Sequence, residues 1–439
     1  MVKLLEILIA IVMVGIVIAV HEFGHFLVAK LNGVTVTEFA LGMGPKLISK
    51  KYKGTVYCIK LLPFGGSCQM LGEGEDSDEQ GSFSTKNVWQ RISIVFAGPF
   101  FNFILAFLFS LIIIFAIGYD EPFVFDVSPE MEASTGLKNG DVITSYQGHR
   151  IRVGRDLSMY ELLDGIDARD ITITYLRDGK EYKVTYAPEH IAKYYIGISY
   201  SVDNAAPGKG PMVISKVVAG GAAEKAGMQE NDVIIAINDA VVSDVDSFTA
   251  YTDAHPFSDQ AVRIKVRRGE QELDLTMTPH FSESYGLGFT YNDVYRSRTG
   301  FVKSIGHGFG EVGYWIKSVV KSLAYMLKGK ATREDIGGPV RVVSEMSNVM
   351  ETSYRNDGLF YAFLNLINWA ILLSANLGVM NLLPIPALDG GRLLIYIIEV
   401  IRGKKMKPEH EAIINFVGFA LLMLLMVFIL FNDLSIVFK

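Results

Sequence analysis

The sequence LLEILIAIVMVGIVIAVHEFGH, which runs from Leu4 to His25, joins an apolar stretch to a cluster of ionisable side chains. Between Leu4 and Val20 the only charged residue is Glu6, and the run matches the roughly 20 residues that a helix needs to cross a membrane. Residues four positions apart share one face of a helix, so His21 and His25 can direct a ring nitrogen at the same ion. Ionisable groups within membrane helices are costly and usually functional. This stretch therefore predicts a metal site on a membrane helix.

Three further stretches of the 439 residues lack charged side chains, and they are 92–119, 358–388 and 412–432. Half of all residues are apolar and one fifth are charged, which excludes a disordered chain. The net charge of -6 argues against a general nucleic-acid binder, so we expect no nucleic-acid partner. The first stretch could be a signal peptide, but no A-x-A cleavage site follows it, and we interpret it as a retained helix. The sequence predicts four transmembrane helices in a lipid bilayer.

The distribution of basic residues predicts the orientation of these helices, because short loops rich in Lys and Arg stay in the cytoplasm. The segment 30–91 has eight basic residues, and the loop 389–411 has five. Both should be cytoplasmic. The long segment 119–358 has 26 basic and 34 acidic residues, a net charge of -8, and should lie on the opposite side together with both termini.

Residues 122–291 contain a repeat with an offset of 91 positions. The run GLKNGDVI at 136–143 returns as GMQENDVI at 227–234, and GISY at 197–200 returns as GFTY at 288–291. Each copy resembles an α/β PDZ domain of the circularly permuted bacterial type, and the match is carried by AGMQENDVI at 226–234 and its weaker twin at 135–143. Such domains bind extended chain ends by strand addition. Modules that act only as spacers, without such a ligand, are the alternative.

A catalytic zinc site has three protein ligands and one open position, so the two histidines need a third partner. Asp389 is the only acid close to the end of the third apolar stretch, where the chain reads NLLPIPALDGG from 381 to 391. Its two prolines and two glycines should break the helix, which is tolerated at membrane depth where backbone lines a cavity. The alternative is an Asp that only caps the next helix, beginning near Arg392. Glu22 can take a proton from a zinc-bound water and deliver it to a leaving amine.

With these motifs in place, the chain resembles the site-2 protease family of intramembrane zinc metalloproteases, and within it the bacterial regulator-of-sigma-E type with two PDZ domains. The resemblance covers nearly the whole chain and rests on HEFGH at 21–25, GMGP at 42–45, PFGG at 63–66, GPFFN at 98–102 and NLLPIPALDGG at 381–391. It implies that His21, His25 and Asp389 hold one zinc ion. It also implies that Glu22 activates water and that Asn381 helps to hold the substrate.

The segment between the first two helices reads as a hairpin, with strands at 34–37 and 55–60. The residues alone indicate a cytoplasmic hairpin, whereas the resemblance implies that it dips into the membrane beside the metal and pairs with an unwound substrate. We therefore assign to substrate binding the four glycines of this segment and one Asn of the second helix: Gly42, Gly44, Gly65, Gly66 and Asn102.

Two smaller predictions concern the cysteines and a segment that follows the repeats. Cys58 and Cys68 are expected to be buried thiols, although they could in principle add metal ligands. The stretch 301–327 has apolar residues at helical spacing with interspersed lysines, so it should lie in the membrane interface or pack against the repeated modules.

The sequence thus predicts a membrane α-helical core with a membrane-associated β-hairpin, plus two tandem PDZ domains. The predicted parts are helices one and two with the hairpin (1–121), the two PDZ domains (122–205 and 206–292), an amphipathic helical linker (293–357) and helices three and four (358–439). The predicted function is zinc-dependent cleavage of single-span proteins, such as a trimmed anti-sigma factor or a remnant signal peptide, in a bacterial cytoplasmic membrane. The PDZ pair would stand outside as a size filter. A membrane scaffold with a structural metal and a metal transporter are the alternatives.

Overall fold

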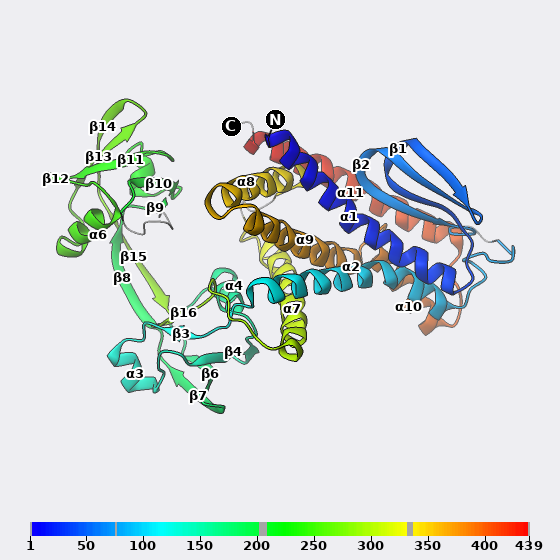
Figure 1. Ribbon diagram of the computed structural model, residues 1–439, viewed down its shortest axis with the longest axis horizontal. Helices are drawn as coiled ribbons and strands as arrows, with labels where there is room; N and C mark the ends of the chain where they lie inside the picture. The colour runs from blue at the N-terminus through cyan, green and yellow to red at the C-terminus, as the bar shows by residue number, and fades with distance from the viewer. Residues whose placement is uncertain (1, 75–76, 202–208, 332–336, 438–439) are drawn as a thin grey trace.

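The computed structural model describes residues 2–74, 77–201, 209–331 and 337–437. A bundle of long helices lies at one end of the molecule and two sheet-containing units lie at the other (Figure 1). Within the described residues, four helices are long and apolar enough to cross a membrane: Ile7–Leu31 of α1, Val88–Ile117 (α2), Leu359–Leu382 (α9) and Glu409–Ser435 of α11. These are the four helices that the sequence predicts.

Helix α1 (Val2–Leu31) continues without a break through the HEFGH motif. It packs closely on α2, because a Cβ atom at Gly24 would lie only 2.5 Å from the carbonyl oxygen of Ala97. Helix α2 begins with a capping box in which the side chains of Asn87 and Gln90 bond reciprocally to backbone amides. The absence of a side chain at Gly24 thus sets the two helices near enough for their side chains to share one site.

The third apolar stretch breaks where its prolines and glycines predict. Helix α9 ends at Leu382, and helix α10 (Asp389–Arg402) begins three residues before the predicted start at Arg392. The last long helix, α11 (Pro408–Val437), passes close to this turn, because a Cβ atom at Gly418 would lie 2.4 Å from the carbonyl oxygen of Pro386. Asp389 therefore occupies the first turn of a helix rather than a loop.

Helix α8 (Pro339–Asp357) is anchored by an acidic residue of the last membrane helix. Asp433 of α11 is fully buried, and its carboxylate accepts hydrogen bonds from the backbone amides of Gly338, Val340 and Arg341. Unpaired amides at a helix N-terminus attract negative charge. Asp433 thus caps a helix far away in the sequence and ties α8 to the membrane bundle.

The predicted hairpin is a two-stranded antiparallel sheet, longer than the sequence indicated. Strands β1 (Val36–Tyr52) and β2 (Thr55–Met70) pair along their whole length with several register shifts. The first half of β1 alternates between buried and partly buried residues, whereas its second half is exposed. The first half of β1 pairs on both of its edges, because Glu38 lies opposite both Gln69 and Val56 of β2. The turn between β1 and β2 therefore folds back beside the start of β1, where the buried Thr55 hydroxyl donates a hydrogen bond to the carbonyl of Val36 at 2.8 Å. Both strands lie at the helical-bundle end of the molecule (Figure 1).

The 91-residue repeat appears as two units with the same strand pairing. The first unit contains β3 (Val124–Phe125), α3 (Pro129–Thr135), β4 (Val142–Tyr146), β5 (His149–Arg150), α4 (Arg155–Asp164), β6 (Ile171–Arg177) and β7 (Lys180–Tyr186). The second contains β9 (Ile198–Ser201), β10 (Met212–Val217), α5 (Ala222–Lys225), β11 (Val233–Ile237), β12 (Ala240–Val241), α6 (Val245–Ala254), β13 (Val262–Arg268) and β14 (Gln271–Met277).

Register and hydrogen bonds both reproduce the offset of 91. Ile143 pairs with Tyr175 in the first unit, and Ile234 pairs with Val266 in the second. In each unit an Arg at the end of a central strand forms an ion pair with a buried Asp. In the first unit Arg177 Nη2 lies 2.6 Å from Asp141 Oδ2, and in the second Arg268 Nε lies 2.7 Å from Asp232 Oδ1.

The two units exchange their edge strands across the predicted boundaries. Strand β16 (Thr290–Tyr291) follows the second unit in sequence but pairs with β3 of the first. Accordingly, Leu287 and Phe289 are buried in the core of the first unit, while Ile196 is buried in the core of the second. The antiparallel ribbon of β8 (Glu189–Tyr195) and β15 (His280–Gly286) connects the two (Figure 1). The second unit is thus inserted into the first.

Helix α7 (Phe301–Leu327) packs against both the first unit and the membrane helices. Arg155 of α4 lies between the buried carboxylates of Asp120 and Glu311, at 2.9 Å and 2.7 Å. On the membrane side, the rings of Phe309 and Phe107 stack with centroids 4.4 Å apart. Helix α7 therefore makes the contacts with the repeated modules that the sequence left open, and also lies against α2.

Candidate metal centre

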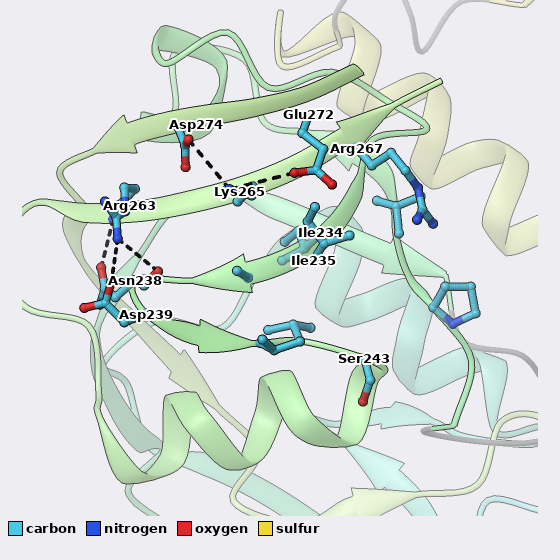
Figure 2. A pocket seen from close by; sticks show the side chains of 15 residues that line it. Ile234, Ile235, Asn238, Asp239, Ser243, Arg263, Lys265, Arg267, Glu272 and Asp274 are labelled. Atoms are coloured by element: carbon cyan, nitrogen blue, oxygen red, sulfur yellow. Dashed lines mark hydrogen bonds and ion pairs between the residues drawn. The ribbon is translucent and has the colours of Figure 1, made fainter. Parts of the chain in front are cut away.

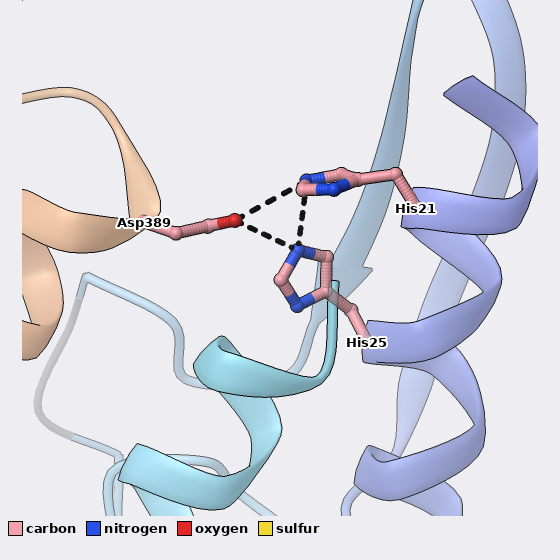
Figure 3. A group of neighbouring side chains, drawn as sticks. All are labelled: His21, His25 and Asp389. Atoms are coloured by element: carbon pink, nitrogen blue, oxygen red, sulfur yellow. Dashed lines mark hydrogen bonds and ion pairs between the residues drawn. The ribbon is translucent and has the colours of Figure 1, made fainter. Parts of the chain in front are cut away.

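Three side chains from two distant parts of the chain converge inside the helical bundle. His21 and His25 project from α1 toward Asp389 at the start of α10 (Figure 3). The Nε2 atoms of the two histidines lie 3.3 Å apart, and Asp389 Oδ2 lies 3.2 Å from His21 Nε2 and 3.3 Å from His25 Nε2. These three residues form a cluster suited to holding a metal ion, and both histidines are buried.

The dimensions of this triangle fit zinc. In tetrahedral zinc sites the nitrogen and oxygen ligands lie about 2.0–2.2 Å from the ion, which places ligand atoms roughly 3.3–3.5 Å from one another. The observed separations of 3.2 and 3.3 Å are close to this range. Asp389 Oδ2 is buried, and no donor among the described residues is aligned to form a hydrogen bond with it. The three ligand atoms therefore match one face of a tetrahedron and leave the fourth position free for water or substrate.

His25 is held in the tautomer that a metal ligand needs. Its Nδ1 atom lies 2.9 Å from the backbone carbonyl oxygen of Ile94 in α2. Since a carbonyl can only accept, Nδ1 carries the proton and the lone pair of Nε2 points at the cluster. A carbonyl partner of this kind is common behind zinc-ligating histidines.

His21 has an equivalent partner in Asn102. Its Nδ1 atom lies 3.2 Å from Asn102 Nδ2, and Asn102 is fully buried with its Oδ1 atom unpaired. Half a turn of the carboxamide exchanges Oδ1 and Nδ2. In that orientation Oδ1 accepts a proton from Nδ1 and Nε2 is free to bind a metal, so both the buried oxygen and the ring are satisfied. Asn102 therefore lies behind the metal cluster, not in an open substrate path.

Gly98 of the GPFFN motif lies directly against the two rings. A Cβ atom at this position would lie 2.3 Å from His25 Nε2 and 2.9 Å from His21 Cε1. No side chain fits between α2 and the cluster. The glycine is therefore required for the close approach of α2 to both histidines.

Glu22 lies next to the hairpin. A Cβ atom at Gly66 of β2 would lie 2.7 Å from Glu22 Cγ. Gly42 also has a tight neighbour, since its Cβ would lie 2.3 Å from the carbonyl oxygen of Leu62 across the hairpin. Gly65 faces the side chain of Met43, and Gly44 has only the Leu62 side chain near it. The structure thus places Gly66, which pairs with Leu41 of β1, beside Glu22, whereas the nearest neighbours of Gly42, Gly44 and Gly65 belong to the hairpin itself.

Asn381 lies at the end of α9, on the same side as the cluster. Its Nδ2 atom is 3.4 Å from His21 Nε2, the atom that points toward Asp389. Leu388 is the N-cap residue of α10, which has no side-chain cap, and Asp389 Oδ2 in the first turn has no hydrogen-bond partner among the described residues. The alternative in which Asp389 only caps α10 is therefore not what the structure shows.

The two cysteines are free and buried. Neither belongs to the metal cluster found among the described residues. Burial raises the pKa of the Cys68 thiol, which disfavours the thiolate form that binds metals. Both thiols are thus structural in this arrangement, as the sequence led us to expect.

Comparison with known proteins places the chain in a family. The family model for peptidase family M50 matches residues 9–425. Zinc metalloprotease RasP of Geobacillus kaustophilus is 31% identical, with 99% of this chain and 99% of that protein covered. RasP of Bacillus licheniformis is 30% identical, with 97% of each covered, and "Probable protease eep" of Enterococcus faecalis is 29% identical, with 97% of each covered.

Among solved structures, the HtrA3 PDZ domain bound to a phage-derived ligand aligns with 22% of this chain and 93% of its own length, at 18% identity. Its TM-score of 0.18 is too low to support an argument about the fold. The match to the family model and to full-length relatives does not depend on it. The chain therefore belongs to peptidase family M50, the site-2 protease family.

Proposed function

We propose that this protein is an intramembrane endopeptidase that uses one zinc ion held by His21, His25 and Asp389. The observation that carries the proposal is the triangle of ligand atoms with separations of 3.2–3.3 Å, buried where a membrane helix meets the start of α10. Glu22 adjoins this triangle in sequence and on the helix. A purely structural metal would have no use for a base beside its ligands.

Glu22 and Asn381 would perform the proton transfer and the substrate positioning. Bound zinc would polarise the scissile carbonyl and acidify a water at the open position. Glu22 would accept the proton of that water and pass it to the leaving amine. Asn381 Nδ2, 3.4 Å from His21 Nε2, would donate a hydrogen bond to the substrate carbonyl. Asn102 would keep His21 oriented from behind.

The β1–β2 hairpin would hold the substrate in an extended form. Among the described strands, β1 pairs only with β2, so the outer edges of the hairpin remain available for strand addition. Helical substrates hide their carbonyls in internal hydrogen bonds, and pairing with an edge would expose them. Gly66 against Glu22, together with Gly42, Gly44 and Gly65, would let the substrate backbone pass close to the base.

The substrates would be single-span proteins of the anti-sigma type after a first cut, or remnant signal peptides, in a bacterial inner membrane. The two repeated units, as PDZ domains outside the membrane, would exclude substrates with large outer domains and could hold their chain ends. The metal centre would lie near the cytoplasmic side. The ties between α7 and the first unit support this arrangement, because they keep that unit over the bundle.

The test compares the native chain with Glu22→Gln on a tagged single-span substrate that lacks its outer domain, with zinc measured in both. The proposal predicts about one zinc per chain in each protein and a loss of cleavage of at least about a hundredfold in the variant. Undiminished cleavage by Glu22→Gln would refute the assigned chemistry. The size filter is tested with a variant that lacks residues 122–291. If this variant still prefers trimmed over full-length substrates as strongly as the native chain does, the size filter is contradicted.

A further inference from the structure

A cavity of about 790 Å³ lies between the first unit, the end of α2 and the start of α7. Residues of β4 and β5 form one wall, and the segment 297–310 forms the other. Four cationic side chains line it, but only one carboxylate, Glu121, and that group accepts a hydrogen bond from the Tyr119 hydroxyl at 2.8 Å. The four cations are Arg150, Arg152, Arg298 and Lys303.

The cavity lies at the level where a membrane helix leaves the hydrocarbon. The apolar span of α2 ends at Ile117, two residues before Tyr119 of the cavity wall. The first turns of α7 run along the last turns of α2, since Phe301 stacks on Phe115 with ring centroids 5.6 Å apart. Phe301 and Val302 remain 69% and 80% exposed. This apolar surface next to a basic cavity matches the boundary between acyl chains and lipid headgroups.

The four cations of the cavity outnumber its one carboxylate, Glu121, so the cavity remains positively charged. Within the part of the chain that the structure describes, none of the four cations forms an ion pair with a carboxylate. Arg298 donates only to the carbonyl of Ala116 at the end of α2, at 3.4 Å. The surrounding segment 119–358 carries a net charge of -8, so a cluster of unpaired cations is contrary to its overall composition.

A second cavity, on the other unit, shows the ordinary arrangement. It has a volume of about 680 Å³ and lies on the exposed face of β11, β13 and β14 (Figure 2). Its three basic residues are matched by three acidic ones. Arg263 lies 2.6 Å from Asp239, and Lys265 lies between Glu272 and Asp274 at 3.8 and 4.0 Å. Balanced pairs of this kind are typical of a solvated sheet surface and need no ligand.

We propose that the cavity between the first unit, α2 and α7 binds the phosphate group of an anionic phospholipid. Arginine side chains bind phosphate oxygens with paired N–H groups, and Lys303 adds a point charge from α7. The acyl chains would lie along Phe301 and Val302. The same phosphate chemistry exists in soluble phosphate esters, but the adjoining lipid-exposed surface favours the membrane-bound form. This site depends on the membrane placement of α2 and not on the metal centre.

The test uses the full chain in a neutral detergent, with bound lipid counted by native mass spectrometry. Phosphatidylglycerol and phosphatidylcholine are added at equal mole fractions, and glycerol 1-phosphate serves as the soluble competitor. The variant Arg150→Gln/Lys303→Gln is compared with Arg263→Gln/Lys265→Gln, which removes two cations from the balanced cavity. Removing one cation at a membrane surface weakens binding of an anionic lipid about fivefold.

The proposal predicts that phosphatidylglycerol is retained by the native chain and the control variant, and that the Arg150/Lys303 variant binds it about 25-fold more weakly. Phosphatidylcholine should not compete. Equal retention of phosphatidylglycerol by the three proteins would overturn the proposal. So would displacement of the lipid by glycerol 1-phosphate at matched concentration, because the site would then recognise a soluble ester. Melting temperatures and the charge-conserving Lys303→Arg variant, which should retain the lipid, show whether a loss reflects misfolding.

Discussion

His21 and Asn102, from two different membrane helices, meet through Nδ1 of the ring and the side-chain carboxamide at 3.2 Å. The contact is fully enclosed, because Asn102 has no exposed surface and Ser374 of α9 donates to its backbone carbonyl at 2.8 Å. Three helices thus meet behind His21. This arrangement fixes the ring before any ion arrives.

Replacing Asn102 by Leu should therefore weaken zinc binding about 10- to 100-fold, the usual loss when a partner behind a ligating histidine is removed. Asn102→Asp keeps an acceptor for Nδ1 and should bind zinc far better than the Leu variant. Competition with a chelator measures the affinity. The control is Asn368→Leu, which removes a side-chain amide from α9 instead of α2 and should leave zinc binding normal. If Asn102→Leu binds zinc as tightly as the native chain, the contact does not orient His21.

Gly98→Ala should damage the metal centre directly. The new methyl group would lie 2.3 Å from His25 Nε2, so one of the helices or rings has to move. Overpacking of this kind costs about 1–3 kcal/mol, which corresponds to a loss of zinc affinity of about 5- to 150-fold. Gly15→Ala in α1, where nothing lies within 4 Å, is the matched control and should leave zinc affinity unchanged. Equal zinc affinity in the two variants would contradict the close packing of α2.

Arg155→Gln should loosen the first unit from α7. The substitution leaves Asp120 and Glu311, which are 0% and 3% exposed, without their shared cation. Breaking a buried ion pair from one side costs about 3–5 kcal/mol. Hydrogen exchange should therefore rise in α7 and α4. Arg169→Gln, which breaks an ion pair exposed to solvent, should leave exchange as in the native chain. Unchanged protection of α7 in Arg155→Gln would show that the cluster does not hold the two parts together.

The insertion of the second unit into the first predicts two different deletion outcomes. Replacing residues 196–279 by Asn-Gly should close β8 and β15 into a hairpin, since Tyr195 and His280 are paired and a two-residue turn suits that geometry. The first unit should then remain folded. Deleting 206–292 instead removes Leu287 and Phe289 from its core and should unfold it. Hydrogen exchange at Ile143 and Ile173 distinguishes the outcomes. Equal protection in both deletions would contradict the exchanged strands.

The membrane helices and the three residues of the candidate metal cluster were predictable because each depends on local features of the sequence. Charge-free runs define the helices, and the spacing of His21 and His25 places both on one face. Asp389 was found because it was the only acid near the break after Leu382. These features do not require knowledge of how one element is rotated against another.

The remaining features depend on pairing between distant segments. Strands β9 and β16 have similar sequences, and only their hydrogen-bond partners show that each completes the sheet of a different unit. The contact between Asn102 and His21 depends on the rotation of α2 about its axis, which the tight packing at Gly24 and Gly98 determines. The motif GPFFN drew attention to Asn102, but the sequence did not distinguish a role behind the metal cluster from a role in the substrate path.

The most direct test of the account is the X-ray absorption spectrum of zinc bound to the purified full chain. The account predicts two imidazole nitrogens and carboxylate or water oxygens at about 2.0–2.2 Å, with no sulfur ligand. Asp389→Ala should lose one oxygen ligand or the ion itself. A sulfur shell at about 2.3 Å would instead assign Cys58 or Cys68 to the metal and contradict the centre formed by His21, His25 and Asp389.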